Sequence, residues 1–121
     1  DEEGFVFLVD RKKDMIISGG ENIYCAEVER VLALDPDFVE VALFGTPDAR
    51  LGERAVAAVT LRPGARRTAE GVKAFVRERL ADYKVPADIV FDLGPLPRNV
   101  TGKVDKKALR RLYLQRAGVD I

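Results

Sequence analysis

The sequence predicts an α+β fold: a small two-layer domain with a short β-hairpin, a mixed central sheet and about three helices. Two observations support this expectation. Runs rich in β-branched and aromatic residues alternate with segments whose apolar residues recur at helical spacing. The expected hairpin comes first, and the strand–helix and helix–strand pieces that follow need not all be parallel. The chain has 121 residues, 47% hydrophobic and 33% charged, which suits one domain with a buried core.

The first half of the chain is expected to contain the hairpin, one helix and two longer strands. The hairpin strands are residues 5–9 and 15–17, separated by a charged turn, and Gly19-Gly20 ends the second strand. A helix over residues 26–34 follows, because three apolar residues share one face: Val28, Val31 and Leu32. The longer strands cover residues 38–44 and 54–61, and a turn containing proline ends each: Thr46-Pro47-Asp48 and Pro63-Gly64.

The second half is expected to contain two helices around one short strand. The first helix begins at the N-cap Thr68 and ends near Leu80, with these residues facing inward: Val72, Phe75, Val76 and Leu80. A strand over residues 87–91 and a loop rich in proline and glycine follow. Asp105 then caps a final helix that ends near Gly118, and its apolar stripe is Leu109, Leu112 and Tyr113.

Charge is unevenly distributed along the chain although the total is zero. Residues 1–50 contain twelve acidic and five basic residues, a net of −7, so residues 51–121, with eight and fifteen, carry +7. A neutral total disfavours a general nucleic-acid-binding domain. Between Arg98 and Arg116 seven basic side chains face a single acidic one. That segment indicates either a solvated helix face or a surface that meets phosphates.

The cysteine and histidine content excludes several kinds of site. Cys25 is the only cysteine and there is no histidine. An internal disulfide is therefore impossible, and a zinc site of cysteine and histidine ligands or a cysteine–histidine nucleophile pair is disfavoured. An unpaired cysteine suits a reducing compartment. No apolar run approaches the roughly 20 residues of a membrane span. We therefore predict a cytoplasmic domain with no metal site of its own and no transmembrane segment.

Three short segments carry residues suited to chemistry: residues 10–24, residues 83–86 (Tyr-Lys-Val-Pro) and residues 97–103 (Pro-Arg-Asn-Val-Thr-Gly-Lys). The Gly102-Lys103 pair is not a P-loop, because that pattern requires glycine where Pro97 stands and serine or threonine where Val104 stands. What remains is a tight turn that presents one ammonium group. Taken singly, each segment is more typical of an ordinary surface turn than of a functional site.

Together, and in this order, the three segments resemble the C-terminal domain of the adenylate-forming enzymes. This superfamily includes acyl- and aryl-CoA synthetases, the adenylation domains of peptide synthetases and beetle luciferases. The resemblance covers about residues 4–113, and the loop over residues 18–24 is most similar to that of fatty-acyl-CoA ligases. It implies that residues 1–13 hold the end of a strand near the hinge and the hinge itself, and that residues 14–121 form a mobile C-terminal domain.

The resemblance implies two half-reactions and a role for each segment. A carboxylate and ATP first give an acyl-adenylate and pyrophosphate, and CoA then displaces AMP to form a thioester. Lys103 matches the catalytic lysine of adenylation, Lys13 matches the hinge, and Arg11 is expected near the nucleotide. Three residues of one loop would line the pantetheine channel, where a missing side chain lets the thiol arm pass close to the backbone: Ser18, Gly19 and Gly20.

The partners implied are an N-terminal adenylation domain of the same polypeptide, a carboxylic acid (a fatty acid), ATP and CoA. The family also implies Mg²⁺, bound by the N-terminal domain. The nucleotide-binding motifs of that domain are absent from these 121 residues, so the chain alone is expected to be inactive. Two other functions stay open, namely an adenylation domain that loads a carrier protein and a non-catalytic interaction module with the same fold. Activity with free CoA as acceptor distinguishes the first of these.

Overall fold

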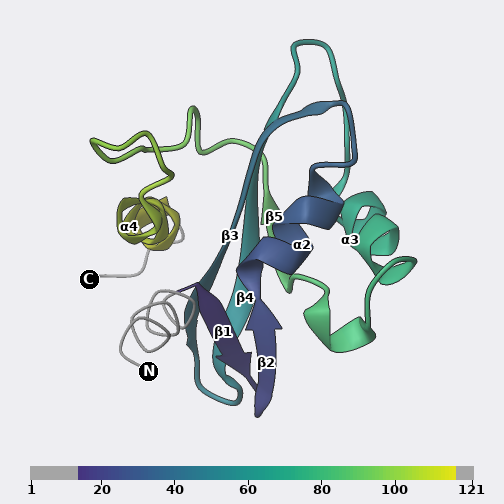
Figure 1. Ribbon diagram of the computed structural model, residues 1–121, viewed down its shortest axis with the longest axis vertical. Coiled ribbons are helices and arrows are strands. Elements are labelled where there is room, and N and C mark those ends of the chain that lie inside the picture. The colour runs from purple at the N-terminus through teal and green to yellow at the C-terminus, as the bar shows by residue number, and fades with distance from the viewer. Residues whose placement is uncertain (1–13, 117–121) are drawn as a thin grey trace, which may run out of the picture.

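Residues 14–116 are described by the computed structural model, and they form a mixed five-stranded sheet with helices on both faces (Figure 1). The strands are β1 (Met15–Ser18), β2 (Glu21–Tyr24), β3 (Phe38–Asp48), β4 (Gly52–Leu61) and β5 (Asp88–Val90). The helices are α2 (Cys25–Leu32), α3 (Ala69–Arg77) and α4 (Lys106–Arg116), and a short 3-10 helix covers Asp82–Lys84.

Strands β3 and β4 form the long antiparallel pair around which the sheet is arranged. Their pairing runs from Asp48 opposite Gly52, beside the connecting turn, to Phe38 opposite Leu61. The β1–β2 hairpin joins this pair where Ser18 lies opposite Gly52. Strand β5 is parallel to β4. The sheet is therefore mixed, as the sequence predicts.

Two apolar cores lie on opposite faces of the sheet, because successive side chains of β3 and β4 point in opposite directions. Leu43 faces α2 and α3, which contribute Val28, Leu32, Val72 and Val76 to the first core. Phe44 faces α4 in the second core. There its ring meets that of Tyr113 edge to face, with centroids 5.7 Å apart and an interplanar angle of 73°.

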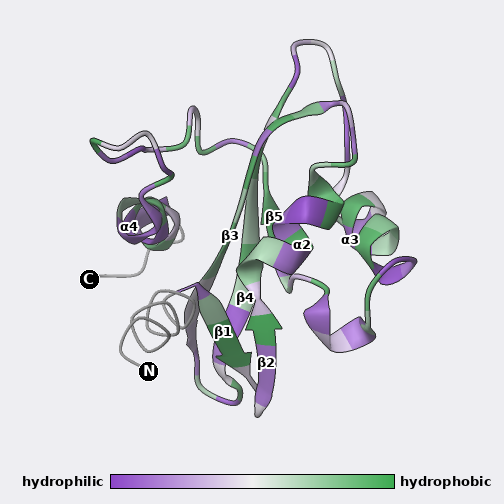
Figure 2. Cartoon of the chain, in the orientation of Figure 1, coloured by the Kyte–Doolittle hydropathy of each residue, from purple (hydrophilic) through white to green (hydrophobic). Residues whose placement is uncertain are grey.

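The α+β class, the hairpin, the mixed sheet and three helices are thus confirmed, and the layering goes beyond the expected two layers. Helix α4 covers the face of the sheet opposite α2 and α3 (Figure 1). The cause lies in β4, where residues 55–59 are all buried. A strand that is apolar on both faces must be covered on both. In Figure 2 each of the three helices carries hydrophobic and hydrophilic residues, as expected for helices that bury one face.

The hairpin formed by the described residues is not the pairing of residues 5–9 with 15–17 that the sequence suggested. It is formed by β1 and β2, and Gly19-Gly20 is its two-residue turn rather than the end of a strand. Both glycines have positive φ, 59° and 86°, as the tightest hairpin turns require. Residues 21–24 carry a single buried apolar residue, Ile23, which is too little pattern to predict β2. The strand predicted over residues 5–9 lies outside the described residues.

Three further expectations are corrected or completed. The predicted turn at Thr46-Pro47-Asp48 is wrong, since β3 continues to Asp48; β3 is an edge strand, where proline is tolerated. Leu112 is 40% exposed, so the buried stripe of α4 consists of Leu109 and Tyr113 alone.

Both predicted helix caps are confirmed. The Gly71 amide donates a hydrogen bond to Thr68 Oγ1 (3.0 Å), and the Ala108 amide donates one to Asp105 Oδ1 (3.1 Å). Gly118 lies outside the described residues.

Thr46 provides a test of this core. Within residues 14–116 it has the one buried side-chain polar atom with no hydrogen-bond partner, and the residue is 2% exposed. Replacing its hydroxyl by a methyl group keeps the volume and removes an unsatisfied polar atom. We expect Thr46→Val to raise the free energy of unfolding by about 1 kcal/mol, measured by urea unfolding. The control is Thr60→Val, because the Thr60 hydroxyl donates to Glu40 (3.1 Å). A loss of stability in both variants would contradict the prediction.

Candidate functional site

Lys103 lies on a short loop that leaves the sheet after β5 and returns at the start of α4. We call residues 97–105 the lysine loop; Figure 1 shows it beside the sheet, above α4. The Asp105 amide donates to the Pro97 carbonyl (2.8 Å), and Arg98 and Val104 form an isolated antiparallel bridge. The two ends of the loop are therefore held together, and its tip is a tight turn.

The side chain of Asn99 determines the shape of this turn. Its Oδ1 accepts hydrogen bonds from the Thr101 amide (3.0 Å), the Thr101 hydroxyl (2.6 Å) and the Lys103 amide (3.2 Å). The backbone amide of Asn99 in turn donates a hydrogen bond to the Lys103 carbonyl (2.8 Å). Gly102 completes the turn with φ of 87°, a conformation that favours glycine. The backbone on both sides of Lys103 is thus fixed by local hydrogen bonds.

Arg98 and Glu40 clamp the lysine loop to strand β3. The Arg98 guanidinium donates to Glu40 Oε2 (2.6 Å) and to the Gly102 carbonyl (2.9 Å). The other carboxylate oxygen of Glu40 accepts from the Leu96 amide (3.2 Å) and the Thr60 hydroxyl (3.1 Å). One carboxylate on the sheet therefore holds the start of the loop, and through Arg98 also its tip.

Glu40 is a site residue that the sequence analysis missed. Its side chain is only 17% exposed, in a strand of otherwise mostly apolar residues. Burial alone would raise the pKa of Glu40, but the hydrogen bonds from Arg98, Leu96 and Thr60 outweigh burial and lower the pKa below its usual value. The available signal was a single acid within an apolar strand, since a buried carboxylate needs a partner.

The ammonium group of Lys103 faces solvent, and no carboxylate among residues 14–116 lies within 4 Å of it. Lys106, at the start of α4, differs in this respect, since it is paired with Asp14 and Glu29. A cation held on a rigid turn without a counter-ion of its own is suited to meet an anionic ligand.

The second predicted group lies at the β1–β2 turn. We call Ser18, Gly19 and Gly20 the glycine turn. The Gly19 amide donates to the Leu51 carbonyl (2.9 Å), which fixes the turn to the β3–β4 connection. A pocket of about 340 Å³ lies beside it and is also lined by Tyr83 and Val85. The structure therefore brings two of the three sequence segments together at one surface.

The lysine loop is not part of that surface. Figure 1 shows the glycine turn at the tip of the hairpin and the lysine loop at the other end of the sheet. Arg11 and Lys13, predicted near the nucleotide and at the hinge, lie outside the described residues. Asp14 is the first residue described after them, and its carbonyl accepts from the Cys25 amide (3.0 Å).

Residues 14–116 bring no three His, Cys, Asp or Glu side chains together in a group that could hold a metal ion. None of the helices formed by these residues has the length and apolar character needed to cross a membrane. Burial raises the pKa of the Cys25 thiol to about 12, so this side chain is a core residue and not a nucleophile.

The clamp yields a prediction about stability and pH. A lowered pKa in the folded state means that ionised Glu40 stabilises the fold above its unfolded value of 4.5, and that this contribution is lost as the pH falls through the folded value. We expect Glu40→Gln to lower the free energy of unfolding by about 1 kcal/mol at pH 7. The difference from wild type should shrink below about pH 4.

Urea unfolding of the 121-residue chain at pH 7 and pH 3.5 measures both effects. Glu70→Gln is the control, because Glu70 is 85% exposed and its nearest cation, Lys73, is 3.7 Å away. The same Glu40→Gln difference at both pH values would show that the carboxylate charge does not hold the loop.

The chain is similar in sequence and in structure to known proteins. Residues 27–103 match the family model described as AMP-binding enzyme C-terminal domain. The 2-succinylbenzoate–CoA ligase of Geobacillus kaustophilus is 47% identical over 112 residues, and the indoleacetate–CoA ligase of Aromatoleum aromaticum is 46% identical over 116 residues. These alignments cover 93% and 96% of this chain. Among solved structures, the Mycobacterium tuberculosis fatty acyl CoA synthetase superposes with a TM-score of 0.78 at 42% identity over 89% of the chain.

The chain corresponds to only part of each of these proteins. It spans 23% and 22% of the two ligases and 21% of the solved synthetase. The match nevertheless includes the glycine turn's hairpin in the sequence alignments and residues 97–103 of the lysine loop in the family model. The chain therefore belongs to the family of AMP-binding enzyme C-terminal domains.

Proposed function

We propose that the chain is the mobile C-terminal domain of an ATP-dependent acid–CoA ligase and contributes a different surface to each half-reaction. The observation that carries this proposal is the lysine loop: an exposed ammonium group on a turn that Asn99 shapes and that Arg98 and Glu40 clamp to the sheet. Such preorganisation is what electrostatic catalysis requires, because no reorganisation is then needed when charge develops.

In the first half-reaction a carboxylate oxygen attacks the α-phosphorus of ATP, and the bond to pyrophosphate breaks. Both reactants are anions, so their approach is opposed by repulsion, and negative charge builds on the phosphoryl oxygens. Lys103 would lie between them and stabilise that charge. Arg11 is assigned a place near the nucleotide on the basis of the sequence motif alone.

In the second half-reaction the CoA sulfur attacks the acyl carbonyl carbon, the thiol proton is lost, and AMP leaves. For this step we assign the pantetheine channel to Ser18, Gly19 and Gly20, reached after rotation about Lys13. The separation of the glycine turn from the lysine loop supports this assignment (Figure 1). Two surfaces at different ends of one rigid domain suit two steps that use them in turn.

The acid substrate is proposed to be a fatty acid. The fatty acyl CoA synthetase among the similar structures supports this choice, as does the loop over residues 18–24. The domain described here supplies the lysine and the channel wall, whereas the pocket for the acid is assigned to the N-terminal partner domain. Unpaired Cys25 and the use of ATP and CoA support a cytoplasmic location.

Lys103→Ala in the full-length ligase tests the first assignment. We expect ATP–pyrophosphate exchange to fall about 100- to 1000-fold, because one preorganised charge is lost at the transition state. Thioester formation from supplied acyl-adenylate should stay near wild type with free CoA. Lys107→Ala is the control, since Lys107 is also exposed and lies on α4. Equal loss in both half-reactions would indicate that Lys103 has a structural role only.

Gly20→Leu tests the channel assignment, and the structure supplies its control. Gly20 has φ of 86° and open space around a Cβ, and Gly64 has φ of 84° and equally open space in the β4–α3 loop. Leucine at either position should cost about 1 kcal/mol of stability through backbone strain. Only Gly20→Leu should block thioester formation while sparing adenylation. If Gly64→Leu impaired the thioester step as strongly, strain rather than channel blocking would be the cause.

A further inference from the structure

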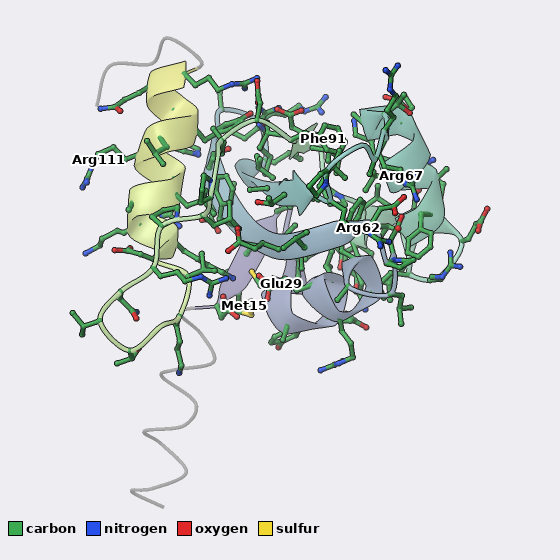
Figure 3. All side chains as sticks on the ribbon, turned by 90° about the horizontal axis from the view of Figure 1, so that it is seen from above. Met15, Glu29, Arg62, Arg67, Phe91 and Arg111 are labelled. Atoms are coloured by element: carbon green, nitrogen blue, oxygen red, sulfur yellow. The ribbon has the colours of Figure 1, made fainter. Side chains whose placement is uncertain are left out.

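Lys106 joins three parts of the domain that lie far apart in the sequence. It is the first residue of α4, three residues after Lys103. Its ammonium group forms ion pairs with Asp14 Oδ1 and with Glu29 Oε2, the latter at 2.8 Å. Asp14 directly follows the proposed hinge residue, and Glu29 lies on α2. In Figure 3 Glu29 and Met15, the neighbour of Asp14, lie close together near the start of α4 and the lysine loop.

Each partner of Lys106 is itself fixed to the framework. Glu29 Oε2 also accepts a hydrogen bond from the backbone amide of Leu43 on β3 (2.8 Å). The Asp14 carbonyl accepts a hydrogen bond from the Cys25 amide at the start of α2 (3.0 Å).

The side chains of Lys106 and Glu29 are only 24% and 23% exposed. Burial opposes the charge of Lys106, but its surroundings, with Cys25, Asp14 and Glu29 adjacent, raise its pKa above the usual value. The ammonium group therefore stays charged under ordinary conditions.

These contacts complete the attachment of the lysine loop. Arg98 holds the beginning of the loop to Glu40 on β3, and Lys106 holds the end of the loop to α2 and to the chain beside the hinge. Without Lys106, α4 would still be packed through Leu109 and Tyr113, which lie one and two turns further along the helix. Its first turn, which adjoins Lys103, would lose its ionic attachment to the hinge side of the domain.

We propose that Lys106 is a positioning residue for adenylation: it ties the end of the lysine loop to Asp14, so that Lys103 turns as one rigid body with the residue next to the hinge. This inference rests on the proposed role of Lys103. A displacement of about 1 Å at a reacting group can cost up to about 100-fold in rate, so loss of the tie should act on kcat.

The test uses the full-length ligase, ATP–pyrophosphate exchange and the carboxylic acid that the wild type converts fastest. Lys106→Met should lower kcat about tenfold with KM for ATP little changed, and Lys106→Arg should restore most of the rate. Lys107→Met, the adjacent exposed lysine, should match wild type. In a Lys103→Ala background, Lys106→Met should cause no further loss, because it acts through Lys103.

The outcomes separate this inference from the proposed function. A wild-type rate for Lys106→Met, or the same tenfold loss in both backgrounds, would overturn the positioning role while Lys103→Ala still shows whether Lys103 catalyses adenylation. If Lys106→Met does not fold, Asp14→Asn replaces it, since that change leaves the Lys106–Glu29 pair. Asp14→Asn should lower kcat by a smaller factor than Lys106→Met does, and only where Lys103 is intact. A wild-type rate for Asp14→Asn would overturn the inference.

Discussion

The antiparallel pair of β3 and β4 determines where both candidate surfaces lie. Its turn end carries Leu51 and Gly52, to which the glycine turn is attached by a backbone hydrogen bond and a strand pairing. Further along the pair, Glu40 and Thr60 lie opposite each other and hold the lysine loop. The pair is apolar on both faces and is packed by helices on each side. Because a close-packed core resists deformation, the distance between the two surfaces is set by the length of the strands.

Two carboxylates, Glu29 and Glu40, attach the lysine loop, and their pairs resemble each other. Each carboxylate accepts one hydrogen bond from a backbone amide and forms one ion pair. For Glu29 the partners are the Leu43 amide and Lys106, and for Glu40 they are the Leu96 amide and Arg98. Such pairs add only about 1 kcal/mol of stability even where, as at Glu40, the hydrogen bonds outweigh the cost of burial. Their main effect is on geometry. A partly buried carboxylate without its partner is costly, so arrangements of the loop that break either pair are disfavoured.

The sequence identified residues that stand in a recognisable local motif, and missed those that act through distant partners. Paired glycines and a glycine–lysine turn are visible locally, so the glycine turn and Lys103 could be proposed without a structure. Glu40 meets Arg98 across 58 residues, and Asp14 meets Lys106 across 92. No periodicity links such positions. The same limit explains β3, since a local turn signal at Pro47 gave no information on whether the strand was at the sheet edge.

The glycine turn meets two demands that a single residue type satisfies. As a two-residue hairpin turn it requires positive φ at both positions, and Gly19 also lies so close to Leu51 that a Cβ would approach its Cδ2 to 3.1 Å. Gly20 has no such neighbour, and open space surrounds the position of its missing side chain. Backbone geometry therefore accounts for glycine at position 19 twice over, through φ and through packing. At position 20 only the positive φ, 86°, requires glycine, because nothing lies within 4 Å of a Cβ built there.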